Sequence, residues 1–518
     1  MYQLLVSILL FHDAYAASIL AISPSASFSH QVAFQPLWRE LSLRGHQVTV
    51  MTTDPQKNDS LTNLTEIDMS YSYEILKKYD MVSVLSDDRT GLREKGKMVL
   101  RMSREVQDAQ LSSDAVQKLL HGNMNFDLVI VEAQLPGMMA FAWRFKCPLI
   151  GIASMDAAMQ FHDTMGNPCH PVITPDPNVR VEDYQHITFK ERLISFFFAL
   201  AYKLLIYNKT YREEHELLKK YFGEDLPPIW NIQRNMSMLF VNAHPLFSPM
   251  RPLNPNTIIV SGLHIGKPKP LPKELADFLD KAKQGFIYFS LGSNIRADIY
   301  NRTMNIDAIL EAMAEVPYKV LWKLDMEFAK TPNNVKVVKW LPQQDVLRHP
   351  NIKLFITQGG MQSLQEAIIN KVPILGIPMF GDQFNNVNMM VKRGCGIKLD
   401  RSLIDKQTFK KAVIEAIEEP RYRQKAQEMG EMFEDEPTLS LQRAVYWTEY
   451  VIKHKGAPHL TSNVPYMPFW MYYMLDVIVS ALTAIVIVAA VLYLVLSRII
   501  SFILCKCFRN YLYKAKPD

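Results

Sequence analysis

Residues 340–386 constrain the fold of this chain more than any other stretch. Within them, residues 354–357 form a short apolar run, typical of a buried parallel strand, which ends at the glycine pair 359–360. Ser363 and Glu366 then have the spacing of a capping box, which predicts that a helix starts there. A strand, a glycine turn and a helix start together form a phosphate-binding unit, although ordinary strand–helix–strand units share this order.

A second polar site is expected where the next strand ends. Residues 372–378 read as another buried strand, and Asp382 and Gln383 follow it closely. Ligands of open α/β sheets bind at the carboxyl ends of the strands. Since carboxylate and amide groups at that edge suit sugar hydroxyls, the whole stretch points to a nucleotide-sugar site.

Together with these residues, others in the stretch form a pattern of definite order and spacing. They are, in order, Trp340, Leu341, Pro342, Gln343, Gly359, Gly360, Ser363, Glu366, Pro373, Asp382, Gln383 and Asn386. Their order and spacing resemble the signature of the UDP-glycosyltransferases, and the resemblance extends from about His30 to the C-terminal tail. Gln358 stands where most of the family has histidine, which is similar to the insect branch of the membrane-bound animal enzymes.

The resemblance implies a role for each residue of a donor site. It implies that Trp340 stacks on the uracil, that Gln343 holds the nucleoside and that Glu366 binds the ribose hydroxyls. Asp382 and Gln383 are expected to bind the sugar. The residues expected to line the diphosphate are Ser293, Gln358, Gly359, Gly360, Gln362 and Ser363.

Alternating apolar runs predict two doubly wound halves. Residues 18–22 and 47–52 read as strands around a helix over residues 31–44, with Gly45 as its C-cap. The scheme repeats with strands at 126–131 and 148–153, and then with strands at 286–289 and 318–323 around a helix at 306–314. This pattern predicts an α/β fold of two Rossmann-like domains facing a cleft, which is the GT-B architecture of the family that the chain resembles.

Domain boundaries are placed by these runs. We expect a signal peptide at 1–16, an N-terminal acceptor-binding domain at 17–262, a Pro/Lys-rich linker at 263–273, a C-terminal UDP-sugar-binding domain at 274–460, a transmembrane helix at 477–497 and a cytosolic tail at 498–518. A chain of 518 residues exceeds the size at which single cores stop growing, so two globular domains are the default.

Both ends of the chain indicate a membrane. Ala14 and Ala16 follow a short apolar run in the pattern of signal-peptide cleavage, although no basic residue precedes them and a first strand extended backward is the alternative. Residues 477–497 carry no charge and are long enough to span a bilayer. Basic residues follow the span, so the positive-inside rule predicts a single-pass type I protein with luminal catalytic domains.

The C-terminal tail and the sequons bear on location. Lys514 and Lys516 resemble a dilysine retrieval signal, which predicts the endoplasmic reticulum membrane, with a lipid-binding basic tail as the alternative. Five Asn-x-Ser/Thr triplets are candidates for N-glycosylation in the lumen: Asn58, Asn63, Asn208, Asn235 and Asn301.

Composition narrows the partners. The 57 basic and 52 acidic residues are dispersed, which disfavours nucleic acid. Cys147, Cys169 and Cys395 are an odd and sparse luminal set, so no disulfide framework is expected. No metal site and no cofactor are indicated, because the UDP-sugar is a co-substrate, and the sequence leaves a homo-oligomer open.

The catalytic base is expected in the N-terminal half. His30 follows the first predicted strand, where a side chain enters the cleft, and histidine is the natural base near neutral pH, although a lone histidine is more often structural. The resemblance assigns His30 as the base. It places an aspartate that orients this histidine where Glu132 stands here, and a carboxylate that only solvates the cleft is the alternative.

The resemblance implies direct displacement with inversion, in which a hexose, glucose rather than glucuronic acid, passes from a UDP-sugar to a hydroxyl of a small lipophilic acceptor. Because Gln358 offers only neutral donors and Glu132 replaces aspartate, a catalytically weakened member that sequesters lipophiles is the alternative.

Two apolar segments of the N-terminal half have two interpretations each. Met155, Met159, Phe161 and Met165 suit either an acceptor pocket or the core. Residues 193–207 read as a core helix or as one resting on the membrane.

Overall fold

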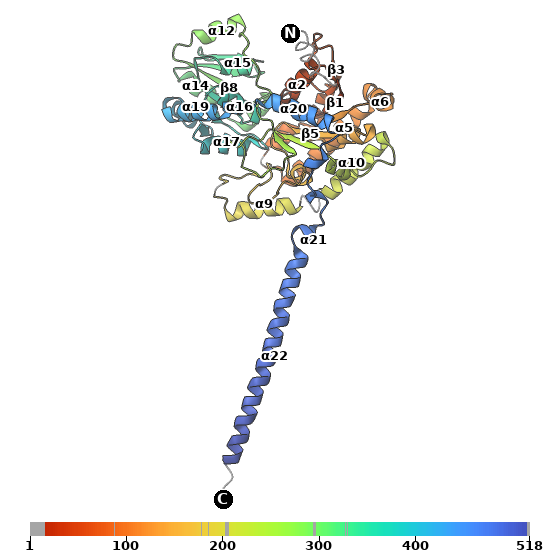
Figure 1. The fold of residues 1–518 in the computed structure, drawn as a ribbon. Coiled ribbons are helices and arrows are strands. Elements are labelled where there is room, and N and C mark those ends of the chain that lie inside the picture. The colour runs from red at the N-terminus through yellow and green to blue at the C-terminus, as the bar shows by residue number, and fades with distance from the viewer. Residues whose placement is uncertain are drawn as a thin grey trace, which may run out of the picture. The chain divides into compact units, whose positions relative to one another are not determined.

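The computed structural model describes residues 16–514, except residues 88, 178, 185, 202–206, 294–296, 327 and 329. The chain divides into two compact units, one that ends at Thr461 and one that starts at Ser462 (Figure 1). The predicted signal peptide lies almost entirely outside the described residues. The same holds for Lys516 and for the side chains of Lys514, Asn208 and Asn301.

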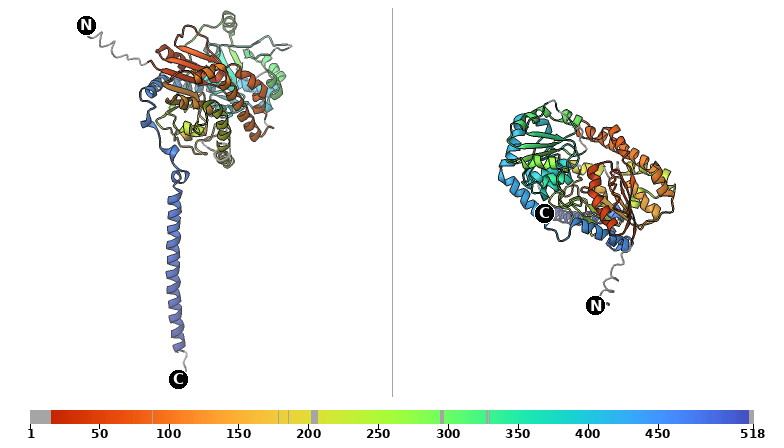
Figure 2. Two further views of the ribbon diagram at one scale, coloured as in Figure 1. Left: turned by 90° about the vertical axis from the view of Figure 1, so that its right-hand side faces the viewer. Right: turned by 90° about the horizontal axis from the view of Figure 1, so that it is seen from above.

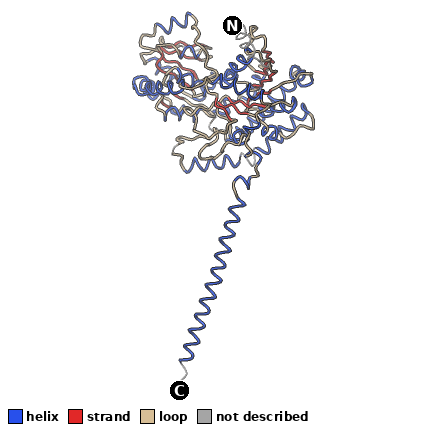
Figure 3. The backbone as a smooth tube through the Cα atoms, viewed as in Figure 1, coloured by secondary structure: helices blue, strands red, loops and turns tan. Residues whose placement is uncertain are grey.

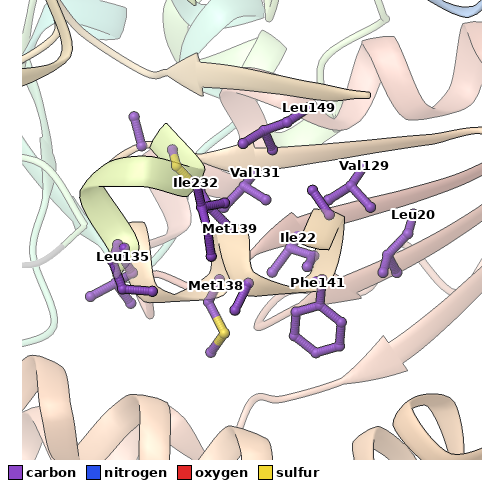
Figure 4. Packing of buried hydrophobic residues seen from close by; sticks show 14 of the residues in the cluster. Leu20, Ile22, Val129, Val131, Leu135, Met138, Met139, Phe141, Leu149 and Ile232 are labelled. Atoms are coloured by element: carbon purple, nitrogen blue, oxygen red, sulfur yellow. The ribbon is translucent and has the colours of Figure 1, made fainter. Parts of the chain in front are cut away.

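The first half of the larger unit is built on a seven-stranded parallel sheet in the order β3-β2-β1-β4-β5-β6-β7. Its strands are β1 Ser18–Ser23, β2 Gln47–Thr52, β3 Leu64–Asp68, β4 Leu128–Glu132, β5 Leu149–Ala153, β6 Met238–Val241 and β7 Thr257–Ile259. Leu20 and Ile22 enter the core on one face of the sheet, shown in Figure 4, and Ile19 and Ala21 enter the core on the other. Both faces are therefore covered, as in a doubly wound fold.

Helices connect these strands and cover the two faces. They are α2 Phe28–Leu43, α3 Ser72–Tyr79, α4 Met81–Ser86, α5 Leu92–Ser112, α6 Asp114–His121, the 3-10 turn η1 Pro136–Met139, α7 Ala140–Phe145, α8 Met159–Thr164, α9 Phe189–Ala201, α10 Tyr207–Phe222 and α11 Ile229–Arg234. Helix α4 also contacts the second half, because Val82 packs into a core of the second sheet.

The second half is built on a six-stranded parallel sheet in the order β10-β9-β8-β11-β12-β13, and Figure 3 shows the two separate groups of strands. The strands are β8 Phe286–Ser290, β9 Lys319–Lys323, β10 Val335–Val338, β11 Ile352–Thr357, β12 Ile374–Gly376 and β13 Gly396–Lys398. The helices are α12 Lys273–Asp280, α13 Ala297–Thr303, α14 Ile306–Ala314, α15 Gln343–Leu347, α16 Met361–Ile369, α17 Gln383–Lys392, η3 Arg401–Leu403, α18 Lys406–Glu418 and α19 Pro420–Glu434. The two predicted α/β halves are thus present, side by side in the view from above (Figure 2).

The segment predicted as a linker is held along the second half. The Gly266 N–H donates to Gln344 Oε1 at 3.0 Å, and the Lys269 N–H donates to Asp345 Oδ1 at 2.9 Å. Both acceptors lie on α15. The crossing from the first half to the second is therefore fixed to the second half by hydrogen bonds.

The last helix of the larger unit packs on the first half, so the boundary expected at 460 does not describe the packing. Helix α20 Ser440–Lys453 and the turn η4 Pro458–Leu460 follow α19. Ala444, Val445 and Val451 lie in the same core as β1, and Arg44 Nη1 lies 3.3 Å from Glu449 Oε1. The reason is that α2 alone is too narrow to cover this face of a seven-stranded sheet, and the apolar stripe of α20 covers more of it (Figure 1).

The second unit contains η5 Val464–Tyr466, α21 Phe469–Tyr472 and α22 Leu475–Lys514. By length and composition, Leu475–Asn510 is a helix able to cross a membrane, and it contains the predicted span at 477–497. The chain therefore carries one candidate membrane helix among its described residues.

Candidate functional site

His30 and Glu132 lie in contact at the carboxyl edge of the first sheet. His30 is in the first turn of α2, after the loop that leaves β1, and Glu132 is the last residue of β4. Because β1 and β4 are parallel neighbours, their carboxyl ends meet. His30 Nδ1 lies 2.5 Å from Glu132 Oε1, and the Glu132 side chain is fully buried. Glu132 thus reaches the imidazole through its Nδ1 atom.

Two further groups surround this pair. Ser154 Oγ lies 3.1 Å from His30 Nδ1, and the Ser25 N–H donates to Glu132 Oε2 at 3.4 Å. Burial lowers the pKa of His30, but Glu132 and the more distant Asp382 outweigh burial, so the net pKa is raised. Asp382 belongs to the second half, which means that the charge on His30 depends on both sides of the cleft.

Asp382 precedes α17 and is held by its own helix. Asn386 Nδ2 donates to Asp382 Oδ2 at 2.7 Å and to the Gly359 carbonyl at 3.0 Å. Burial raises the pKa of Asp382, while the bond from Asn386 and the charge of His30 oppose that rise. Gln383 is buried, and its Oε1 accepts the N–H groups of Met379 and Phe380 at 2.9 and 3.1 Å, which fixes the loop after β12. Its amide nitrogen is the part available for a ligand.

Gly359, in the turn after β11, has no room for a side chain. Gly359 has φ +88°, and a Cβ there would lie 2.3 Å from Val387 Cγ2. A Cβ on Gly292, in the neighbouring turn after β8, would lie 2.3 Å from Gln358 Nε2. The Gln358 side chain therefore packs over Gly292, and its buried Oε1 has no hydrogen-bond partner among the described residues. Ser293 follows Gly292 and is exposed.

The predicted capping box is wrong. Helix α16 begins at Met361 with Gly360 as its N-cap, so Ser363 lies in the first turn and Glu366 lies inside the helix. Gly360 takes the extended conformation that an N-cap requires, which moves the start upstream. The N–H groups of the first turn still point out of the helix toward the glycine turn, so the phosphate-binding geometry is kept.

Ser363 and Glu366 share one partner instead. Gln343 Nε2 donates to Ser363 Oγ at 2.9 Å and to Glu366 Oε2 at 2.7 Å, and the Tyr288 hydroxyl donates to Gln343 Oε1 at 3.1 Å. His264 Nε2 lies 3.3 Å from Glu366 Oε1. The residues expected to hold the nucleoside thus belong to one partly buried hydrogen-bond network.

Trp340 lies where the two halves meet. Its side chain is 55% exposed. The Lys323 ammonium lies 4.6 Å from the Trp340 ring centroid, and Phe28, two residues before His30, makes an edge contact at 4.9 Å. The expected uracil platform is therefore open to solvent but bordered by a residue from the first half.

Gln362 points across the cleft. Its Nε2 donates to the Ser154 carbonyl at 2.8 Å, and the neighbouring Gln365 pairs with Asn242 of the first half, with Nε2 to Oδ1 at 2.5 Å. The structure thus brings together the expected donor residues, but it uses the Gln362 side chain to join the halves. Ser154 was missed from the sequence, although its place directly after a predicted strand was a signal.

A small cavity of about 30 Å³ lies between the halves beside Asp382. It is lined by Met155, Asp156, Pro175, Pro177, Tyr184, Phe247, Ser248, Pro249, Met361, Asp382, Asn385 and Asn386. Of the four apolar residues singled out from the sequence, only Met155 lines it, because Met159, Phe161 and Met165 are buried in the core of the first half. The cavity joins first-half residues to the residues expected to hold the sugar.

One wall of this cavity continues into a segment that is hydrogen-bonded to α17. This segment is here called the strap (residues 177 and 179–183). Asn385 Nδ2 donates to the carbonyls of Pro177 and Val179, and the Val181 N–H donates to Asn385 Oδ1 at 3.1 Å. The Arg180 guanidinium lies 3.6 Å from the Phe384 ring centroid. The first half therefore fixes the helix that presents Asp382, a role for Asn385 that no sequence signal indicated.

Comparison with solved structures gives the class of protein. The crystal structure of the glycotransferase of kitacinnamycin matches with a TM-score of 0.57 and 18% identity, covering 84% of this chain and 99% of that one. The crystal structure of TcCGT1 in complex with UDP matches with a TM-score of 0.55 and 15% identity, covering 85% and 100%. Two parallel sheets facing a cleft, together with these neighbours, define a GT-B glycosyltransferase fold.

Sequence comparison gives the family. A family model described as "UDP-glucoronosyl and UDP-glucosyl transferase" matches residues 18–510, and the chain belongs to that family. It is 35% identical to UDP-glucosyltransferase 2 of Dactylopius coccus, with 89% of each chain covered. It is 28% identical to UDP-glucuronosyltransferase 2B1 of Rattus norvegicus, with 92% of each covered. The resemblance seen in the sequence is thus confirmed, and the protein is an enzyme that transfers a glycosyl group from a UDP-sugar to an acceptor.

Proposed function

We propose that this enzyme transfers glucose from UDP-glucose, with inversion, to a hydroxyl of small lipophilic acceptors. The observation that carries the proposal is the His30–Glu132 pair, 2.5 Å apart, whose charge is coupled to Asp382 across the cleft. The choice of glucose is supported by the names of relatives such as UDP-glucosyltransferase 2 and the ecdysteroid UDP-glucosyltransferase of Spodoptera littoralis nuclear polyhedrosis virus, which is 30% identical over 93% of this chain and 97% of its own.

In the proposed reaction, His30 Nε2 takes the proton from the acceptor hydroxyl. The oxygen attacks the anomeric carbon from the face opposite the phosphate, and the bond from that carbon to the β-phosphate oxygen breaks. UDP leaves with both electrons of that bond, which inverts the anomeric centre. Glu132 accepts the Nδ1 proton of His30 in a hydrogen bond and stabilises the imidazolium that forms.

The donor is proposed to lie along the second half. Uracil stacks on Trp340, the Gln343–Glu366 network holds the nucleoside and ribose, and the sugar contacts Asp382 and the Gln383 amide nitrogen. The proposed diphosphate contacts are Ser293, Gln358, Gly359, Gly360, Gln362 and Ser363. Because the Gln362 side chain is engaged with Ser154, Gln362 contributes its backbone N–H at the start of α16.

The acceptor is proposed to bind in the cleft at the cavity beside Asp382. Met155, Phe247 and three prolines provide much of its wall, and Asp382 lies at its edge. Such a site suits a small, mostly apolar molecule with a hydroxyl at one end. This supports lipophilic alcohols and phenols as the acceptor class.

The second candidate function is that of a protein with weakened catalysis that sequesters lipophiles. Glu132 and Gln358, which replace residues usual in the family, are the reason to consider it. The direct contact of Glu132 with His30 supports catalysis, since the longer carboxylate reaches the imidazole. Gln358 alone supports only a less stabilised leaving group. We therefore favour the enzyme.

The proposed location is the endoplasmic reticulum membrane, as a single-pass type I protein with luminal catalytic halves. Leu475–Asn510 supports the single span. Asn58 and Asn235 are exposed, which suits glycosylation in the lumen. Endoglycosidase treatment of the expressed protein tests this orientation, and an unshifted mobility together with protease digestion from the cytosolic side would contradict it.

The function is tested on membranes that contain the expressed protein. UDP-glucose, UDP-glucuronate and UDP-N-acetylglucosamine are each offered with a panel of phenols. We expect a conjugate from UDP-glucose with inverted anomeric configuration by NMR, and a loss of about 10³-fold in rate for His30→Ala. Tight acceptor binding without UDP release by the wild type would favour sequestration.

A further inference from the structure

Arg401 is a buried cation to which the proposed reaction assigns no role. It is the first residue of η3 and is only 8% exposed. Its Nη1 donates to the Met379 carbonyl at 2.7 Å, and its Nη2 donates to the Ser86 carbonyl. The planar guanidinium carries its donors in a fixed fork, so it bonds both main-chain oxygens at once. Arg401 thus joins two segments that lie far apart in the chain.

One of these segments is α4 of the first half. Ser86 is the last residue of α4, so its carbonyl has no partner within that helix. Val82, one turn earlier, is 9% exposed and packs in a core of the second sheet. Asp80 Oδ2, just before α4, lies 3.9 Å from Arg302 Nη1 of α13. Helix α4 is therefore docked on the second half, and Arg401 bonds its C-terminal end.

The other segment is the loop before α17, residues 379–382, here called the sugar loop because it carries Asp382. The Met379 side chain is fully buried, and the Met379 N–H donates to Gln383 Oε1 at 2.9 Å. The Phe380 N–H donates to the same oxygen at 3.1 Å. Met379 is thus held through its carbonyl by Arg401 and through its N–H by Gln383. The position of the sugar loop therefore also sets the position of the Gln383 amide nitrogen.

The two hydrogen bonds of Arg401 require both segments to be in place. A buried carbonyl without a donor is unfavourable, so the full stabilisation is reached only when α4 and the sugar loop both contact the guanidinium. The strap bonds the neighbouring helix from elsewhere in the first half, since Asn385 Oδ1 accepts the Val181 N–H at 3.1 Å. The sugar loop and α17 are therefore joined to the first half through different segments.

We propose that Arg401 is a positioning residue for the sugar group of the donor. By joining α4 to the sugar loop, it sets the positions of Asp382 and Gln383 relative to the first half, which carries the proposed base. This inference rests on the proposed contacts of Asp382 and Gln383 with the sugar. Arg401 therefore contributes to binding of the hexose and not to binding of the uridine diphosphate, whose proposed contacts lie elsewhere on the second half.

The test compares Arg401→Met with Arg423→Met in the full chain. Arg423 lies on α19 and donates to the carbonyl of Ile352, the first residue of β11, at the sheet edge opposite the site. With the UDP-sugar that the wild type turns over, Arg401→Met should raise KM for that donor about tenfold, while Ki for UDP changes less than about twofold. Arg423→Met should change both constants less than about twofold. Equal changes in KM and Ki for Arg401→Met, or no change in either, would overturn the positioning role.

Arg401→Lys keeps the charge but loses the fork, so it covers the case in which Arg401→Met does not fold. We expect Arg401→Lys to raise KM for the UDP-sugar about threefold with Ki for UDP unchanged, and the unchanged Ki reports a folded donor site. A lysine variant with wild-type KM would show that the two simultaneous bonds are not required, which would overturn the proposal.

The contribution of α4 is tested by Val82→Ser. Alone, this change should raise KM for the UDP-sugar about threefold, and in the Arg401→Met background it should add nothing, because both act through one contact. Effects that multiply would mean that α4 and Arg401 act independently and would overturn the link between the halves.

Gln383→Glu separates this proposal from the proposed function. It keeps the oxygen that accepts the loop N–H groups but removes the amide donor. A raised KM in Gln383→Glu with an unchanged KM in Arg401→Met would leave the sugar contact standing and overturn the role of Arg401. An unchanged KM in Gln383→Glu would instead contradict the sugar contact of the proposed function.

Discussion

The two sides of the cleft are built in different ways. The side proposed to bind the donor, here called the donor side, comes from one stretch of chain, in which Gln343 binds Ser363 and Glu366, and Asn386 ties Asp382 to Gly359. The side proposed to bind the acceptor, here called the acceptor side, is assembled from separate segments, with the loop after β5, the strap and the loop near Phe247 meeting at one cavity. The donor side is preorganised for one ligand, whereas the acceptor side depends on how distant segments fold together.

This difference predicts where substitutions act. Changes on the donor side should alter the handling of UDP-sugar whatever the acceptor. Changes on the acceptor side should alter proton transfer by His30, the free energy of unfolding or the hydrogen bonds between the strap and α17.

The largest effect is expected at Glu132. In Glu132→Gln the side chain keeps its length but no longer stabilises the imidazolium, so kcat should fall about 10²–10³-fold. The base works only when neutral, so wild-type activity falls as the pH drops through the raised pKa of His30. Removing the carboxylate lowers that pKa, and the acidic limb of the kcat/KM profile should move to lower pH.

Glu132→Asp is the matched control. It keeps the charge but loses reach, so the rate should fall while the acidic limb shifts less than in Glu132→Gln. An unshifted limb in Glu132→Gln would mean that His30 is not the group that titrates.

The next effect concerns stability of the acceptor side. Glu214 is buried in α10, and burial raises its pKa to about 6 against the bonds from Gln107 and the Gly137 N–H. The folded state thus keeps the Glu214 proton up to a higher pH than the unfolded state does. The contribution of Glu214 to the free energy of unfolding is therefore present in acid and is lost as the pH rises through about 6. At neutral pH, Glu214→Gln should raise the free energy of unfolding by up to about 2 kcal/mol.

Thermal unfolding in detergent at acidic and neutral pH measures this gain. The second half offers a contrast, since its buried Glu366 already has Gln343 and His264 as partners. Glu366→Gln should therefore give no such gain. A gain for Glu214→Gln that is equal at both pH values would contradict a titration origin.

Asn385→Ala tests the hydrogen bonds between the strap and α17. This change removes three hydrogen bonds to the strap, each worth about 1 kcal/mol net, and part of that loss should appear as a roughly tenfold rise in KM for the UDP-sugar. Turnover at saturation should change little, because His30 and Glu132 stay in place.

Lys425→Ala serves as the control for that variant. It removes an exposed pair with Glu428 on α19, 2.6 Å apart and away from the strap, and should change KM less than twofold. If the two variants behave alike, the first half does not position the donor helix.

The smallest effect is expected at Gln358. Gln358→His introduces a donor that can carry charge next to the leaving group and should raise kcat about threefold without changing the acceptor range. Gly292 leaves room for the ring, and Gly292→Ala in the same background should cancel the gain. An unchanged rate and UDP-sugar affinity would place the residue outside the diphosphate site.

Much of the sheet framework could be predicted because strand and helix patterns are local. β2 Gln47–Thr52 and α14 Ile306–Ala314 have the predicted bounds. α2 starts at Phe28, before the predicted residue 31, since the apolar Phe28 lay within a polar run that reads as loop. The α16 start was misplaced for a similar reason, because a glycine cap leaves no side-chain signal.

The site divides in the same way. The proximity of His30 and Glu132 was expected from the family resemblance, and the parallel pairing of β1 with β4 brings the two residues to the same edge of the sheet. The strap and the cavity could not be predicted, because the Asn385 side chain bonds backbone groups of a loop, and the path of that loop, like the position of Tyr184, depends on the whole fold. The packing of α20 was equally hidden, since its chain neighbours all belong to the other half.

The return of α20 to the first half has a mechanical consequence. The chain enters the second half through residues 263–273 and leaves it through residues 435–439, so that half is tied at two points. A half that is joined to the other by two chain crossings can rotate about the line between them, but its other rotations are restricted. Opening the cleft to release UDP would then be a rocking motion about this axis, with its rate set by the stiffness of the two crossings.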